Sequence, residues 1–267
     1  MGQDALGDRM KEYERRETAE KFMPLLPIYA RIDGRGFSKF TKGFDFPYDK
    51  RFREAMIDTT KWLVSQTNAR LGYTQSDEIS LCWMAETYDS DVFFGGKKQK
   101  MVSQLAALAT QRFNRFLYTH PDPVVQHMAD KAPTFDARVF QFPSKQECAN
   151  AFVWRERDAT KNALSMAASS VYSHKNLLGK NSADKHQMLF EKGINFNDYP
   201  IEFKRGVYVR RQQIVKSMVV NDEQINAIRT VVDVIAMPRL EQIDNRVDVV
   251  FDGAIPILRD SPILEEE

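Results

Sequence analysis

Three acidic residues stand where they could carry phosphate chemistry. Asp33 ends an alternating apolar and polar stretch over 27–33, and Asp77 and Glu78 interrupt a second alternating stretch over 71–83. If these stretches are strands that pair in one sheet, the three carboxylates meet at one edge. Gathered carboxylates repel unless a cation joins them, and two Mg²⁺ ions can align an attacking hydroxyl and a leaving phosphate. We therefore predict a catalytic centre at Asp33, Asp77 and Glu78.

The neighbours of these acids suit a phosphate ligand. Gly34 and Gly36 let the backbone approach a phosphate closely, and Arg31 shares a strand face with Asp33. A basic run begins a predicted helix further on, with Lys97, Lys98 and Lys100. Lysines there oppose the helix dipole, which indicates a bound anion, although a solvated basic surface explains Lys97 and Lys98 equally well. An acid at a turn is usually a cap, so the prediction rests on the joint placement, which nucleotide cyclases share.

The elements that must position these residues follow from the hydrophobic pattern. We predict strands over 27–33, 71–75, 79–83 and 133–143, and amphipathic helices over 49–69 and 98–118. This order is the split βαββαβ arrangement, an antiparallel sheet with two helices on one face, found in RNA-binding modules and in polymerase and cyclase palms. The predicted fold class is α+β, with a palm-like catalytic domain over 1–143.

The second part of the chain, 144–267, is expected to be a mostly helical region packed on the palm. Ser144 and Glu147 have capping-box spacing ahead of an alanine-rich stretch that predicts a helix from 145 to about 172. Smaller elements are expected beyond it: a helix that Ser182 caps and Gly193 ends, and a strand over 207–209.

Composition limits the location and the charge available for binding. Lys plus Arg total 38 and Asp plus Glu total 37, so the net charge of +1 gives no global field for a polyanion, and a nucleic-acid site must be a local patch. The two cysteines are too few for a disulfide framework and indicate a reducing cytoplasm. We expect no membrane segment, because no apolar run approaches about 20 residues.

Four segments resemble the tRNA-His guanylyltransferase superfamily, in the same order and at similar spacing. They are RIDGRGFSKFT at 31–41, GYTQSDEISL at 72–81, FDARVF at 135–140 and WRERDATKN at 154–162. The segments YSHKNL and MLFEKGINFND and the KRGV turn look closer to the bacterial guanylyltransferase-like proteins than to the eukaryotic enzymes. The resemblance extends to about Arg211.

This resemblance implies a 3′-to-5′ polymerase that acts on the 5′ end of tRNA. In the family, ATP or GTP activates a 5′-monophosphate, and the 3′-hydroxyl of an incoming nucleotide then attacks it. Asp33 and Asp77 match the two Mg²⁺-binding acids, the Gly34 carbonyl matches a backbone ligand, and Glu78 matches the acid beside the second aspartate. Expected nucleotide contacts are Arg31, Gly34, Arg35, Gly36, Phe37, Ser38, Ser76, Lys97 and Lys100. Relatives are homotetramers, so this assembly is expected too.

Departures from the family pattern favour one activity over another. Thr160 stands at the eukaryotic histidine position and only Asn162 stays in register, while Phe46 replaces a family lysine. This favours templated repair of 5′-truncated tRNA over dedicated addition of one G to tRNA-His. A third alternative is a non-catalytic RNA-binding module. Expected RNA contacts are Asn162, His174, Lys175, Lys204, Arg205, Arg210 and Arg211. Trp83 and Trp154 are expected to fill the core.

Overall fold

The computed structural model describes residues 5–220 and 223–259. Its first half contains the four strands and two long helices expected of a palm, and three further α-helices that were not predicted. They are α1 (Ala5–Thr18), β1 (Ile28–Gly34), α2 (Phe37–Phe40), α3 (Lys50–Thr67), β2 (Leu71–Gln75), β3 (Glu78–Trp83), α4 (Lys98–Thr119), α5 (Pro123–Met128) and β4 (Phe135–Gln141). The boundary of α3 has a local cause, because the Asp49 side chain accepts hydrogen bonds from the backbone N–H groups of Arg51 and Phe52.

The strands form one antiparallel sheet in the order β4-β1-β3-β2-β5-β6. The first four strands in this order are those of the split βαββαβ arrangement, so the predicted palm is confirmed. In the centre, β1 pairs with β3 and Asp33 lies opposite Glu78. On its other side β1 pairs with β4, which brings Asp33 opposite Asp136. Pairing of the first and third strands therefore brings the predicted acids to one end of the sheet.

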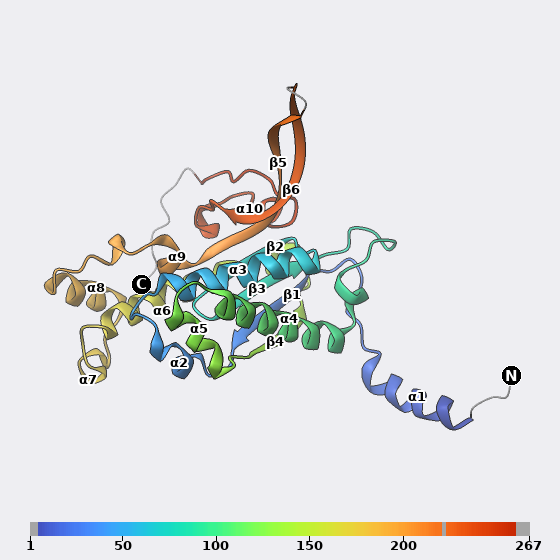
Figure 1. Cartoon of the computed structure of the whole chain (residues 1–267), viewed down its shortest axis with the longest axis horizontal. Coiled ribbons are helices and arrows are strands. Elements are labelled where there is room, and N and C mark those ends of the chain that lie inside the picture. Colours follow the sequence, from blue (N-terminus) through green and yellow to red (C-terminus); the bar gives the residue numbers. More distant parts are fainter. Residues whose placement is uncertain (1–4, 221–222, 260–267) are drawn as a thin grey trace.

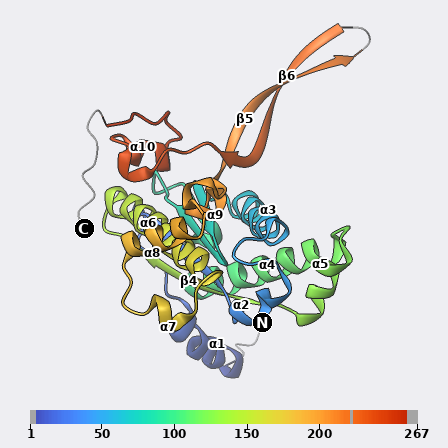
Figure 2. The ribbon, with the colours of Figure 1, turned by 90° about the vertical axis from the view of Figure 1, so that its left-hand side faces the viewer.

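The sheet is covered on both faces, and Figure 2 shows it between α3 and α4 on one side and α6 on the other. Side chains alternate along β1, so Ile32 packs in the core under α3 and α4 with Leu63 and Phe113. Tyr29 points to the other face, where it packs with Phe152 of α6. The two palm helices lie on one face, as predicted, and a later helix covers part of the other.

The second half contains α6 (Lys145–Ser169), α7 (His174–Leu177), α8 (Ser182–Glu191), α9 (Ile201–Arg205), β5 (Val207–Val220), β6 (Glu223–Ile235) and α10 (Arg246–Phe251). The Ser144 hydroxyl accepts from the Glu147 N–H and caps α6 as predicted. The cap of α8 is Asn181 rather than Ser182, because Asn181 and Asp184 form a reciprocal capping box.

The largest departure from the sequence prediction is the hairpin of β5 and β6. The strand expected over 207–209 is only the beginning of a 14-residue strand that pairs with β2 and then with β6. Figure 1 shows the hairpin projecting away from the body. Beyond the stretch that pairs with β2, β5 continues in pairing with β6, and its sequence there lacks the apolar alternation of a half-buried strand. The expectation of a mostly helical second half therefore holds only up to Arg205.

Within the part of the chain that the structure describes, no helix is both long enough and apolar enough to cross a membrane.

Candidate active site

The acidic edge is built by a tight turn between β2 and β3. Ser76 and Asp77 form this turn, and Ser76 adopts a left-handed φ of 46°. The Gly34 N–H donates to the Asp77 carbonyl at 3.1 Å, which holds the turn against the end of β1. Burial raises the pKa of Asp77, and the negative charge of Asp33 raises it further. The two carboxylates predicted from sequence therefore come together across this turn.

Asp33 and Asp77 suit a magnesium ion. Burial is the larger cause of the raised pKa of Asp77 and the charge of Asp33 adds to it, and a divalent cation between the two carboxylates would offset their repulsion. No group of three or more acidic, histidine or cysteine side chains in metal-binding geometry occurs within 5–220 and 223–259. Mg²⁺ does not need one, because it commonly binds one or two carboxylates and takes its other ligands from water and substrate phosphates. Asp33, Asp77 and the Gly34 carbonyl fit that pattern.

Glu78 has a different environment from the other two acids. Its side chain is only 8% exposed, and both carboxylate oxygens accept hydrogen bonds from Arg155 of α6 at 2.7 Å. Arg155 also pairs with Asp158 at 2.6 Å. Burial raises the pKa of Glu78, and Arg155 offsets part of that rise. With both oxygens occupied, Glu78 ties α6 to the palm, and its catalytic role stays a prediction.

The turn after β1 forms the second part of the site. A Cβ on Gly34 would lie 2.4 Å from Cδ2 of Phe37, so only glycine lets this ring pack there. Gly36 has a φ of 68° and begins α2. Of the predicted contacts, Arg35 and Ser38 are exposed, whereas the Phe37 side chain is buried and leaves only its backbone for a ligand.

A cavity of about 370 Å³ opens beside this turn. Arg35, Lys39 and Lys131 line it together with the small backbone-rich segment at 132–134. The Arg35 N–H donates to the carbonyl of Thr134, which fixes one wall. Sequence reasoning did not assign Lys39 or Lys131 to the site. Lys39 lies within the quoted motif at 31–41 and could have been found, whereas only the fold brings Lys131 here.

The basic run before α4 does not reach this edge within one chain. Lys100 lies 6.0 Å from the centroid of the Phe94 ring, and Phe93 stacks on Trp83 at the far end of β3. Five residue steps along β3 separate Trp83 from Glu78, roughly 17 Å. The backbone of Lys97 forms an isolated antiparallel β-bridge with the backbone of Lys21 at the same far end. The structure thus does not bring Lys97 and Lys100 to the acids, and their contact with a nucleotide stays a prediction.

The predicted RNA contacts differ in how far they are bonded within the protein. Arg205 donates to Glu156 at 3.1 Å and to the carbonyl of Met237 at 2.8 Å. Arg210 donates to the carbonyls of Val249 and Val250, so both arginines hold the fold together. The basic stretch is therefore not one patch of free charges, and the RNA contacts of Arg205 and Arg210 stay a prediction. The remaining predicted contacts are at least partly accessible: Asn162, His174, Lys175, Lys204 and Arg211.

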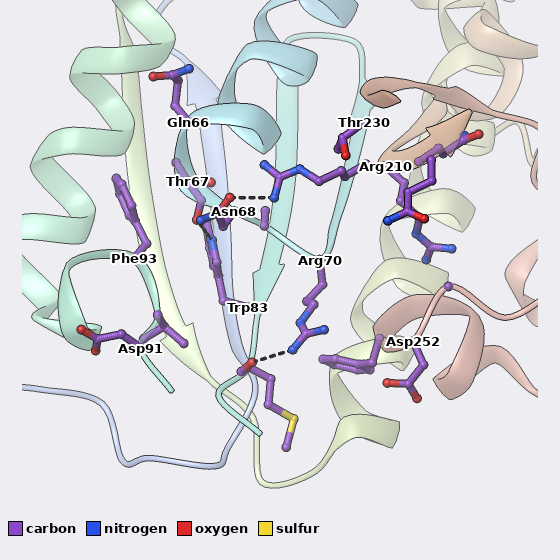
Figure 3. Close-up of a pocket in the computed structure, with 18 residues that line it drawn as sticks. Gln66, Thr67, Asn68, Arg70, Trp83, Asp91, Phe93, Arg210, Thr230 and Asp252 are labelled. Carbon is purple, nitrogen blue, oxygen red and sulfur yellow. Dashed lines mark hydrogen bonds between the residues drawn. The ribbon is translucent and has the colours of Figure 1, made fainter. Parts of the chain in front are cut away.

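A larger cavity, about 670 Å³, lies away from the acids. Figure 3 shows Arg70, Trp83 and Phe93 around it, at the end of β2 and β3 opposite to the turn. Its arginines already have protein partners: Arg70 pairs with Glu86 at 2.6 Å. Arg211 donates to the side chain of Asn68 at 2.7 Å. Asp91 and Asp252 also line this cavity (Figure 3), but it lies at the opposite end of β3 from Asp33 and Asp77.

The fold and this edge place the chain among palm-type nucleotidyltransferases. The family model described as tRNAHis guanylyltransferase matches residues 7–143, and the chain belongs to that family. It is 31% identical over 216 residues to the tRNA(His) guanylyltransferase of Schizosaccharomyces pombe, covering 75% of this chain and 78% of the relative. It is also 30% identical over 237 residues to an uncharacterized protein of Acanthamoeba polyphaga mimivirus, covering 82% and 81%.

Solved structures support the same assignment. A bacterial tRNA(His) guanylyltransferase-like protein in complex with ATP has a TM-score of 0.77 and 32% identity, covering 93% of this chain and 98% of that one. A structure of such a protein in complex with GTP has a TM-score of 0.73 and 32% identity, covering 91% and 99%. The enzyme from Saccharomyces cerevisiae has a TM-score of 0.62 at 27% identity, covering 81% and 95%.

Proposed function

We propose that this enzyme repairs the 5′ end of truncated tRNA by adding nucleotides in the 3′-to-5′ direction, directed by the opposite strand. The observation that carries the proposal is the pairing of β1 with β3, which joins Asp33 to the turn at Asp77 next to the cavity of Arg35, Lys39 and Lys131. Two carboxylates for metal and a basic cavity for a triphosphate are what a phosphate-transfer reaction needs.

The reaction would proceed in two transfers. An oxygen of the tRNA 5′-monophosphate attacks the α-phosphorus of ATP or GTP, and pyrophosphate leaves. The 3′-hydroxyl of the incoming nucleoside triphosphate then attacks the activated 5′ phosphorus, loses its proton, and AMP or GMP leaves. Asp33 and Asp77 would hold the Mg²⁺ ions, which neutralise developing charge and orient both oxygens. Arg35, Lys39 and Lys131 would bind the triphosphate as charge-assisted donors.

Templated repair is preferred because of the comparison with bacterial guanylyltransferase-like proteins. Those two structures match 93% and 91% of this chain, with higher TM-scores than the enzyme from Saccharomyces cerevisiae, and Thr160 replaces the histidine of the eukaryotic motif. The alternative is addition of a single G to tRNA-His, which the names of the fungal relatives favour. We propose a cytoplasmic location, in keeping with the buried free thiols of Cys82 and Cys148, and a homotetramer by analogy with the family.

The deciding experiment uses tRNA that lacks its first 5′ nucleotide and carries a 5′-phosphate label. Four versions of this RNA differ only in the nucleotide opposite the gap, and each is incubated with Mg²⁺ and all four nucleoside triphosphates. We expect the enzyme to add the complementary nucleotide in every case. Addition of G regardless of the opposite nucleotide, with tRNA-His as the preferred RNA, would replace templated repair by the guanylyltransferase alternative.

Two aspartate variants test the metal role. Asp77→Asn should slow extension by on the order of a hundredfold or more, because a bound metal contributes several kcal/mol to phosphate transfer. Asp89→Asn is the matched control, since Asp89 is exposed in the loop after β3, and it should extend RNA at the wild-type rate. Equal rates for Asp77→Asn and the wild type would remove the proposed metal site.

A further inference from the structure

Trp154 is not in the core, although its aromatic character predicted that place. It lies on α6 with 49% of its surface exposed, so much of the ring remains open to a ligand. The guanidinium of Arg155 lies 4.6 Å from the ring centroid and is itself held by Glu78. Because Glu78 holds Arg155 in place, the cation–π contact with Arg155 fixes the position of the indole beside the acidic edge.

Arg31 gives the indole a second cationic neighbour. Its guanidinium carbon lies 5.9 Å from the Trp154 ring centroid. Its nearest acidic atom is Oε2 of Glu78 at 3.9 Å, its side chain is 21% exposed, and its buried Nε has no hydrogen-bond partner among the described residues. A buried donor without a partner is costly, and a bound acceptor would remove that cost.

The edge strand β4 continues the same surface. Arg138 lies directly opposite Arg31 in the β1–β4 pairing and is exposed. Asp136 lies 4.0 Å away and is similarly exposed, so this pair leaves the Arg138 charge available. Phe140, 36% exposed, follows on the same face and packs against Tyr29 at 5.4 Å between ring centroids. The open indole thus lies beside Arg31, whose Nε has no partner among the described residues, and the neighbouring strand carries the exposed Arg138.

We propose that Trp154, with Arg31 and Arg138, is a stacking platform for a nucleobase at the reacting end of the substrate. An aromatic face binds any base by stacking, while the flanking guanidinium groups donate to the phosphate or to the base edge. The inference rests on the proposed function, because the platform would hold a base of one of the substrates of that reaction. The base belongs either to the RNA end or to the nucleoside triphosphate, since both present the same ring chemistry.

Binding is measured with Mg²⁺ absent, so that no turnover occurs. The titrants are ATP, GTP and a 5′-phosphorylated single-stranded RNA, followed by the quenching of tryptophan fluorescence and, for the RNA, by fluorescence anisotropy. We expect Trp154→Ala to weaken binding about 10- to 100-fold, the range for one lost stacked base, and to abolish most of the quenching. Trp154→Phe should retain an intermediate affinity, and Arg138→Gln should weaken binding of the same titrant.

The titrant that Trp154→Ala binds more weakly than the wild type is the substrate whose base stacks on Trp154. Loss for ATP or GTP alone assigns the platform to the nucleoside triphosphate, and loss for RNA alone assigns it to the RNA end. Tyr118→Ala is the matched control, because Tyr118 is 60% exposed on α4 away from α6, and its affinities should equal those of the wild type. Wild-type affinity and quenching for every titrant in Trp154→Ala would overturn the platform.

The outcome is separable from that of the proposed function. If the wild type repairs truncated tRNA and Trp154→Ala binds and repairs equally well, the platform fails and the function stands. If the wild type extends no RNA but Trp154→Ala still loses quenching, the function fails and the nucleobase site stands. A melting temperature of Trp154→Ala equal to that of the wild type shows that the substituted residue left the fold intact.

Discussion

Replacing Arg155 with methionine should destabilise the enzyme strongly and in a pH-dependent way. Arg155 and Glu78 are 9% and 8% exposed and share two hydrogen bonds of 2.7 Å. Arg155→Met keeps the side-chain volume but leaves a buried carboxylate whose nearest cation is Arg31 at 3.9 Å. Removing one partner of a buried pair costs about 3–5 kcal/mol. We expect a loss of this size in the free energy of unfolding near pH 8.

The sign of the pH dependence follows from the pKa of Glu78. Burial already raises this pKa in the wild type, and loss of Arg155 raises it further. An acid whose pKa is raised in the folded state contributes stability that is present below its unfolded pKa and lost as pH rises through its folded pKa. The deficit of Arg155→Met should therefore be smaller at pH 5 than at pH 8, because a falling pH favours the protonated, uncharged form of Glu78.

Urea unfolding at the two pH values measures both effects. Arg157→Met is the matched control on the same helix, because the Arg157 side chain is 62% exposed and its ion pair with Glu241 should contribute under about 1 kcal/mol. The double variant Glu78→Gln/Arg155→Met removes the buried charge and should regain most of the stability at pH 8. A loss below about 1 kcal/mol, or a larger loss at pH 5 than at pH 8, would refute this reasoning.

Three further predictions concern the edge itself. Gly34→Ala should lower the free energy of unfolding by about 1–3 kcal/mol in thermal melts, because the new methyl group would overlap the ring of Phe37; an unchanged melting temperature would contradict that contact. Asp77→Asn should be at least as stable as the wild type at pH 8, since burial and Asp33 raise the pKa of Asp77. This advantage should vanish below about pH 4, because the Asp77 carboxyl is then protonated in both the folded and the unfolded wild type. Lys131→Gln should raise the KM for nucleoside triphosphate about tenfold with a smaller change in kcat, and an unchanged KM would exclude Lys131 from the triphosphate site.

The sequence was sufficient to predict the palm because its signals are local. The period of β1 and the amphipathic pattern of α3 are set by neighbours in the chain, and both elements begin and end close to the predicted residues. The split βαββαβ order then allows only a few sheet arrangements, and pairing of the first and third strands is the one observed. That pairing alone brought Asp33 to Asp77.

Contacts between distant segments decided the rest. Pattern reasoning could not foresee that Glu78 is occupied by Arg155, which comes from a helix 77 positions later, or that Arg205 and Arg210 serve the fold. Lys131 reaches the site only because β4 pairs with β1.

The sequence by itself thus determined the elements of the palm, their order and the two facing aspartates, because these follow from periodicity and turns within short stretches of the chain. Only the tertiary structure decided which charges are free and which are paired, and that Trp154 is exposed rather than buried. The physical reason is that a charge or an aromatic ring has the same local propensity in either environment, so its role depends on what the fold packs against it.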